Sequence, residues 1–212
     1  MEILARISES LEQGNHQNVA ELTRQALASG LAASDILHRG LLPGMTRISE
    51  RFRRHEVFLP DMLLSARAMH AGLDLVKPLL AREGVPALGK VVLGTVRGDL
   101  HDIGKNLVGV MLRADGFEVI DLGTDVPSER FVEAAVAEQA PVIGMSALLT
   151  TTMSRMKEVV ELLAARGLKG RVKTIVGGAP VSAEFARVIG ANAYGYDAAN
   201  AVERVKGLLA VA

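Results

Sequence analysis

Several residue types and patterns are missing from this sequence of 212 residues, and each absence removes a class of function. Without cysteine, the chain forms no disulfide, thiolate zinc site, cysteine-ligated iron–sulfur cluster or thiol nucleophile, so any redox chemistry must belong to a bound cofactor. Its 24 basic and 24 acidic residues cancel, which leaves no net charge to attract nucleic acid or an anionic membrane. Because the sequence shows neither a charged-then-apolar leader nor an apolar run of membrane-spanning length, we expect a cytoplasmic protein.

Apolar residues are plentiful: 49% of the chain is hydrophobic and the mean hydropathy is +0.25, enough for a well-filled core. From residue 1 to about 82, apolar residues recur at helical spacing, as in Ile3, Ile7 and Leu11. One predicted helix covers 34–54, where Pro43 should bend or break it, and another covers 60–80. Together with two helices before residue 30, these make four helices with short connections, which predict a four-helix bundle over residues 1–84.

The periodicity breaks at residues 82–89, which contain two glycines and a proline, so we expect a linker at 85–89. Beyond it, five apolar runs alternate with amphipathic helices, at 90–96, 117–122, 141–147, 172–177 and 192–196. This alternation predicts an α/β domain over 90–212 with a flavodoxin-like (Rossmann-type) five-stranded parallel sheet in the order 2-1-3-4-5. In that order, ligands bind beyond the carboxyl ends of strands one and three.

The loop after the first predicted strand carries two side chains suited to metal binding. Asp99 and His101 lie two residues apart, so the carboxylate can accept a proton from one imidazole nitrogen while the other nitrogen faces the cleft. Ser146 ends the third strand, and we expect its hydroxyl to hydrogen-bond Asp99. Gly177 and Gly178 end the fourth strand, where missing side chains would let a bulky ligand approach the backbone.

An Asp-x-His pair alone is a weak signal, because histidines often only cap helices, but competing ligand classes lack their residues here. A phosphorylatable receiver needs an aspartate where Met145-Ser146 stands, and a flavodoxin needs a hydroxyl-rich phosphate loop at 98–106. The sequence contains no Gly-Lys-Ser/Thr phosphate loop. A hydrolytic triad is also disfavoured, because Ser146 would meet the aspartate rather than the histidine and no nucleophile elbow is visible.

Taken together, Asp99-x-His101-x-x-Gly104, Ser146-x-Leu148 and Gly177-Gly178 resemble the cobalamin-binding signature of methyltransferase corrinoid proteins and of cobalamin-dependent methionine synthase. Residues 52–62 resemble the helical cap domain of the same family. The resemblance implies that His101 is the lower cobalt ligand, in place of the cofactor's dimethylbenzimidazole, with Asp99 and Ser146 as a relay behind it. It implies further cofactor contacts at Asp102, Ile103, Gly104, Ser146, Leu148, Thr150, Gly177 and Gly178, and an upper-face cover of Phe52 and Leu59 beside Met62.

The three cover residues have a simpler interpretation as bundle core, which their apolar character alone would explain.

Two charged features each have two possible interpretations. The cluster of Arg47, Arg51, Arg53, Arg54 and His55 is either a solvated helix face or a docking surface for a partner enzyme. Lys105 meets either a polar group of the cofactor or solvent.

The function implied by the resemblance is a non-catalytic methyl shuttle. It would take a methyl group onto cobalt from a substrate-specific methyltransferase, giving methylcobalamin, and pass it to a second methyltransferase with a tetrahydrofolate or thiol acceptor. A reductive activating protein is a further candidate partner. The alternatives are a cobalamin-binding sensor, which generally carries a DNA-binding or signalling module, and a mutase subunit, which would leave the helical half unexplained. The methyl donor stays open among methylamine, methanol, betaine and aryl methyl ethers.

Overall fold

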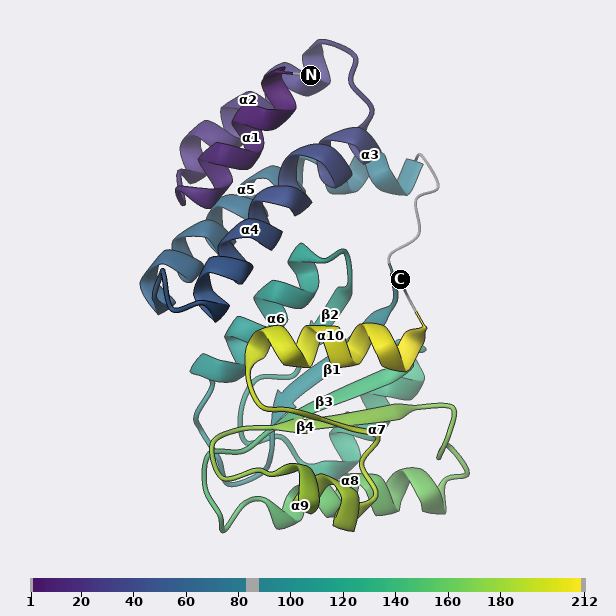
Figure 1. The fold of residues 1–212 in the computed structure, drawn as a ribbon. Coiled ribbons are helices and arrows are strands. Elements are labelled where there is room, and N and C mark those ends of the chain that lie inside the picture. Colours follow the sequence, from purple (N-terminus) through teal and green to yellow (C-terminus); the bar gives the residue numbers. More distant parts are fainter. Residues whose placement is uncertain (1, 83–87, 211–212) are drawn as a thin grey trace. The chain divides into compact units, whose positions relative to one another are not determined.

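The computed structural model describes residues 2–82 and 88–210 (Figure 1). The chain divides into two compact units, Met1–Pro86 and Ala87–Ala212. Most of the predicted linker at 85–89 lies outside the described residues, so its bounds stay a prediction. None of the helices in the described ranges combines the length and the apolar character needed to cross a membrane.

The first unit is helical, which confirms the predicted bundle. It consists of α1 (Glu2–Glu12), α2 (His16–Ala28), α3 (Ala33–Ile36), the π-helical turn η1 (Leu37–Leu41), α4 (Leu42–Arg53) and α5 (Leu59–Arg82). The helix expected over 34–54 is thus interrupted just before Pro43, where the Leu42 N–H donates to the Leu37 carbonyl five residues back. Proline offers no N–H to the carbonyl of Arg39 and crowds it, so the preceding turn widens.

Ion pairs connect α1 to α4 in this unit. Glu12 Oε2 lies 2.8 Å from Arg47 Nε, and Glu12 Oε1 lies 3.0 Å from Arg51 Nη1. Arg47 Nη2 also donates to Ser8 Oγ at 2.8 Å. Two members of the predicted arginine cluster therefore have partners on a neighbouring helix, and the side chain of Arg53 lies outside the described part of the chain.

The second unit contains a parallel sheet in the order β2-β1-β3-β4-β5, as predicted. Its strands are β1 (Lys90–Thr95), β2 (Glu118–Asp121), β3 (Val142–Ser146), β4 (Lys173–Gly177) and β5 (Ala193–Gly195), each within two residues of the predicted run. The register places the last residues of four neighbouring strands abreast: Thr95, Ser146, Gly177 and Gly195. The loops that follow these residues therefore meet at one edge of the sheet.

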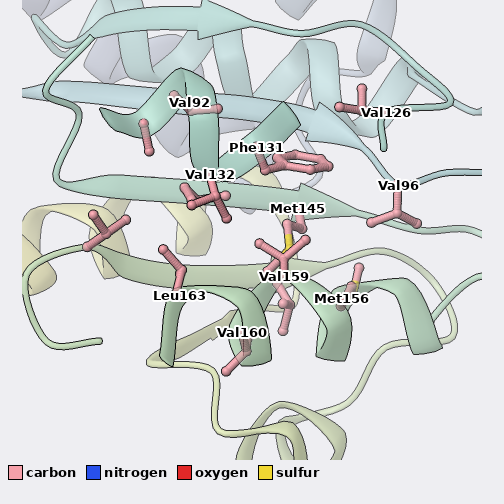
Figure 2. Close-up of a cluster of buried hydrophobic side chains, with 14 of the residues drawn as sticks. Val92, Val96, Val126, Phe131, Val132, Met145, Met156, Val159, Val160 and Leu163 are labelled. Carbon is pink, nitrogen blue, oxygen red and sulfur yellow. The ribbon is translucent and has the colours of Figure 1, made fainter. Parts of the chain in front are cut away.

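Helices cover both faces of this sheet (Figure 1), because the strand order reverses direction after β2 and right-handed crossovers in opposite directions lie on opposite faces. One face carries α6 (Ile103–Ala114) and α10 (Ala198–Leu209); the other carries α7 (Ser128–Ala137), α8 (Ser154–Ala165) and α9 (Ala183–Ile189). Figure 2 shows side chains of α8 pointing at the sheet beside Met145 and the fully buried Phe131. A close-packed core of this kind keeps the strand ends in fixed positions.

Candidate functional site

A buried carboxylate lies at the centre of the sheet's carboxyl edge. Asp99, in the loop between β1 and α6, is fully buried and accepts hydrogen bonds on both oxygens. Oδ1 lies 3.1 Å from the His101 backbone nitrogen and 2.7 Å from His101 Nδ1. Oδ2 accepts from the backbone N–H groups of Leu148 (2.7 Å) and Leu149 (3.2 Å) and from Thr152 Oγ1 (3.0 Å). One carboxylate thus joins the loops after β1 and β3.

These donors decide the charge of Asp99. Burial by itself would raise the pKa of the carboxyl, but hydrogen bonds from Leu148, His101 and Thr152 outweigh it and hold the pKa of Asp99 well below its usual range. An ionised carboxylate only accepts hydrogen bonds, so the proton between the two side chains belongs to His101 Nδ1. Nε2 is then the ring nitrogen that the carboxylate leaves free for a ligand.

The imidazole of His101 is fixed on one side and open on the other. Its side chain is 51% exposed although its partner Asp99 is completely buried. The backbone carbonyl of His101 also accepts a hydrogen bond from Thr95 Oγ1 at 2.9 Å. This is the arrangement of a metal-binding histidine whose tautomer and orientation are set by a carboxylate behind it.

The hydroxyl behind Asp99 belongs to Thr152, and this corrects the expectation that Ser146 fills that role. Among the described residues, Asp99 receives a side-chain hydroxyl from Thr152 alone. The prediction chose the hydroxyl nearest the end of β3, but the chain turns after Ala147 and brings the buried Thr152 back over the carboxylate. The sequence does show that the turn after β3 contains hydroxyl side chains such as Thr152. The alternation of residues along the strand could not indicate which hydroxyl would reach Asp99.

Large apolar side chains surround this polar centre and face solvent. Leu100 and Ile103, on either side of His101, are 73% and 67% exposed. Leu148 and Leu149, whose N–H groups bind Asp99, are exposed as well. Four exposed leucine or isoleucine side chains around a histidine form an apolar surface that a flat hydrophobic ligand would cover.

The predicted glycines divide into two kinds. A Cβ on Gly104, in the first turn of α6, would meet no atom within 4 Å, so this glycine leaves open space beside His101. Gly178 has φ +123°, and a Cβ there would lie 1.9 Å from the Ala147 carbonyl oxygen. A Cβ on Gly177 would lie 3.0 Å from the Gly195 carbonyl oxygen. The double glycine therefore permits close contact between backbones of the protein itself, and the expected ligand contact at Gly177 and Gly178 stays a prediction.

Lys105 points into the protein. In this structure its amino group therefore meets neither of the two expected partners, a polar group of the cofactor or solvent. Its Nζ is buried and lies 2.6 Å from both carboxylate oxygens of Asp121 at the end of β2, and it also donates to Asn106 Oδ1. Asn106 Nδ2 in turn donates to Asp102 Oδ2 at 2.9 Å. Asp102 is thus tied to the first turn of α6.

The remaining predicted contacts are spread over both units. Thr150 is exposed in the turn after β3, and Phe52 is half-buried in α4. Met62 is fully buried in the hydrophobic core, in line with the simpler reading of that residue. The side chain of Leu59 lies outside the described residues.

The donor set around His101 limits which metal group fits. Within the described residues, no three histidine, aspartate or glutamate side chains gather where they could hold a bare ion. A metal at His101 Nε2 must therefore bring most of its ligands with it. The apolar surface and the open space at Gly104 suit a metal in a broad, flat macrocycle.

Comparisons with known proteins identify the family of both units. Residues 89–206 match the family described as B12 binding domain, and residues 3–77 match a second family with the same description. The chain is 40% identical over 210 residues to trimethylamine corrinoid protein 1 of Methanosarcina mazei, covering 98% of this chain and 97% of that protein. It is 42% identical over 211 residues to the dimethylamine corrinoid protein of Methanosarcina barkeri, covering 99% and 98%.

Solved structures show the same similarity. The methanol:cobalamin methyltransferase complex MtaBC of Methanosarcina barkeri contains a chain with a TM-score of 0.89 and 32% identity, over 100% of this chain and 81% of that one. A cobalamin-binding protein of Desulfitobacterium hafniense has a TM-score of 0.78 and 33% identity, over 97% and 98%. On the matched domains, the full-length relatives and the fit of the site, the chain belongs to the family of B12-binding corrinoid proteins.

Proposed function

We propose that this protein carries methyl groups on the cobalt of a bound corrinoid, between a substrate-specific methyltransferase and a second, methyl-accepting methyltransferase. The observation that carries the proposal is the buried Asp99 carboxylate, which directs His101 Nε2 outward through a 2.7 Å contact with Nδ1. When bound, the corrinoid supplies a cobalt centre that accepts and releases the methyl group.

The chain's own residues bind and orient this group. His101 would hold the cobalt through Nε2, and Asp99 would keep the proton on Nδ1 and the ring in place. Leu100, Ile103, Leu148 and Leu149 supply apolar contact area, and Gly104 leaves room for the ligand. Thr152 takes the relay position that we first assigned to Ser146.

The methyl donor that the relatives favour is a methylamine or methanol. Proteins named for trimethylamine and dimethylamine match along nearly the whole chain, and the structural relative comes from a methanol:cobalamin methyltransferase complex. A substrate methyltransferase is therefore the first partner we propose. A methyltransferase with a thiol or tetrahydrofolate acceptor, and a reductive activating protein, complete the proposed set.

The test uses the corrinoid-loaded protein with its cobalt reduced to Co(I). Candidate methylamines and methanol are added with purified partner methyltransferases, and cobalt methylation is followed by absorption. We expect cobalt methylation with one class of donor. In His101→Ala the absorption bands that report a bound lower ligand should be lost. The control His38→Ala, whose side chain is exposed in η1, should have the wild-type absorption spectrum.

Two results would contradict the proposal. One is a His101→Ala protein with the wild-type absorption spectrum and the wild-type rate of methyl transfer. The other is failure with every partner together with a light- or ligand-dependent change of oligomeric state, which would identify a cobalamin sensor.

A further inference from the structure

We propose that Thr95 is a positioning residue for the lower cobalt ligand: it holds the backbone of His101 in place independently of the carboxylate that orients the ring. This inference rests on the proposed function, because it concerns how His101 meets a corrinoid. It adds a residue that the cobalamin signature in the sequence does not contain.

Thr95 is the last residue of β1 and is fully buried. Its Oγ1 donates to the His101 carbonyl oxygen at 2.9 Å. Both backbone polar groups of Thr95 are hydrogen-bonded. Its N–H donates to the Gly123 carbonyl (2.9 Å), and its carbonyl accepts from the Val126 N–H (3.0 Å). The hydroxyl is therefore attached to a rigid part of the sheet.

His101 has three attachments, and they control different parts of the residue. Asp99 Oδ1 lies 2.7 Å from ring Nδ1 and 3.1 Å from the backbone nitrogen of His101. It therefore fixes the direction of the ring and the position of the backbone nitrogen. Thr95 alone contacts the His101 carbonyl among the described side chains. That carbonyl begins the peptide leading to Asp102, the residue before α6. Thr95 thus fixes where the loop enters the helix.

The position of this loop matters for the metal bond. A metal–imidazole bond has a narrow range of lengths and tolerates little displacement of the ligand. The ring of His101 is half exposed, so packing alone does not hold it. If the His101 backbone shifts by a few tenths of an ångström, the distance from Nε2 to the metal changes while Asp99 stays held by the loop after β3.

The hydroxyl can be removed with little change of shape. Thr95→Val keeps nearly the same volume and leaves the His101 carbonyl without its donor. Thr95→Ser and Thr95→Ala form a second pair, which differ from each other by one oxygen atom. The matched control is Thr174→Val: Thr174 is also a buried threonine of this sheet, but it lies near the start of β4, where its Oγ1 accepts from the Asn192 N–H.

The experiment measures ligation rather than turnover. Each variant is produced with 15N-labelled histidine, loaded with cobalamin and reduced to Co(II). Electron paramagnetic resonance then reports whether the 15N nucleus of His101 splits the cobalt lines into doublets, whereas the cofactor's own 14N base would give triplets. For Thr95→Val we expect the ratio of unligated to ligated cobalt to rise about fivefold to tenfold, the size of effect of one lost hydrogen bond. Thr95→Ser and Thr174→Val should match the wild type, and Thr95→Ala should match Thr95→Val.

Failure of this inference differs from failure of the proposed function. If wild-type protein binds cobalamin without 15N splitting, the proposed lower ligand is wrong. If wild type shows the splitting and Thr95→Val shows the same ligated fraction, the role of Thr95 is wrong. Should Thr95→Val fold poorly by thermal unfolding of the apoprotein, the Ser and Ala pair decides: equal ligated fractions in those two proteins overturn the inference.

Discussion

Thr152 Oγ1 donates to Asp99 Oδ2 at 3.0 Å, and both side chains are buried although 53 residues separate them in the sequence. The carboxylate divides its two oxygens between two loops, with Oδ1 serving His101 and Oδ2 serving the loop after β3. Asp99 therefore links the second loop directly to His101, the proposed cobalt ligand. This coupling is the basis of the first prediction.

Replacing Thr152 should affect the lower ligand, whereas replacing Ser146 should not act through Asp99. Thr152→Val removes one donor from a buried carboxylate, so Asp99 becomes a better acceptor for His101 and the basicity of the imidazole changes. We expect a shift of the cobalamin absorption bands and a change of up to about tenfold in the fraction of protein with His101 bound. Ser146→Ala is the control, measured by the same spectra. A larger shift in Ser146→Ala than in Thr152→Val would restore the original assignment.

Two glycine-to-alanine changes should have opposite effects on the apoprotein. Gly178→Ala places a methyl group 1.9 Å from the Ala147 carbonyl at φ +123°, so we expect destabilisation of at least about 3 kcal/mol. Gly104→Ala places its methyl group in open space in the first turn of α6, so it should stabilise the apoprotein by about 0.5–1 kcal/mol. Urea unfolding measures both free energies.

The same pair separates folding from binding. Because the space beside Gly104 is proposed to receive the cofactor, Gly104→Ala should weaken cobalamin binding while the apoprotein becomes more stable. Equilibrium titration with cobalamin gives the affinity. A Gly104→Ala protein that binds as tightly as the wild type would show that the ligand does not enter this space.

Acid should weaken the contact between α1 and α4 through Glu12. Hydrogen bonds from Arg47 and Arg51 lower the pKa of Glu12 below 4.5, against a smaller opposing effect of burial. A lowered pKa in the folded state means that this stabilisation is present above about pH 5 and is lost as the pH falls through the folded-state pKa. Glu12→Gln should therefore cost about 1 kcal/mol at pH 7, and this cost should shrink as the pH falls below 4.5. Thermal unfolding at several pH values tests this, and a cost independent of pH would contradict it.

Phe52 remains our proposed cover of the upper corrin face. Removing an aromatic cover should expose the methyl group, so photolysis of the methylcobalamin-loaded protein should be faster in Phe52→Ala than in wild type. Phe58→Ala is a matched control, because Phe58 is a neighbouring phenylalanine that is largely exposed. Equal photolysis rates in Phe52→Ala and wild type would assign Phe52 to the bundle alone.

Local patterns were sufficient for most of the fold. Each buried strand was visible as a short apolar run, and the helix interruption before Pro43 followed from the missing N–H of proline. The order of the five strands followed from the alternation of strands and helices, since right-handed crossovers leave few other arrangements. The wider turn η1 was not predicted, because the choice between a bend and a π-helical turn depends on packing around it.

The sequence by itself determined the central pair, because Asp99 and His101 lie two residues apart and their contact is local. The cofactor class followed from the resemblance of the combined motifs to corrinoid proteins. Tertiary structure alone decided which hydroxyl stands behind the carboxylate, where Lys105 points and which glycines leave space for a ligand. Those outcomes depend on how the loops after β1, β2, β3 and β4 meet at one edge of the sheet. Spacing along the chain does not report distances between separate loops, as with Asp99 and Thr152, which are 53 residues apart.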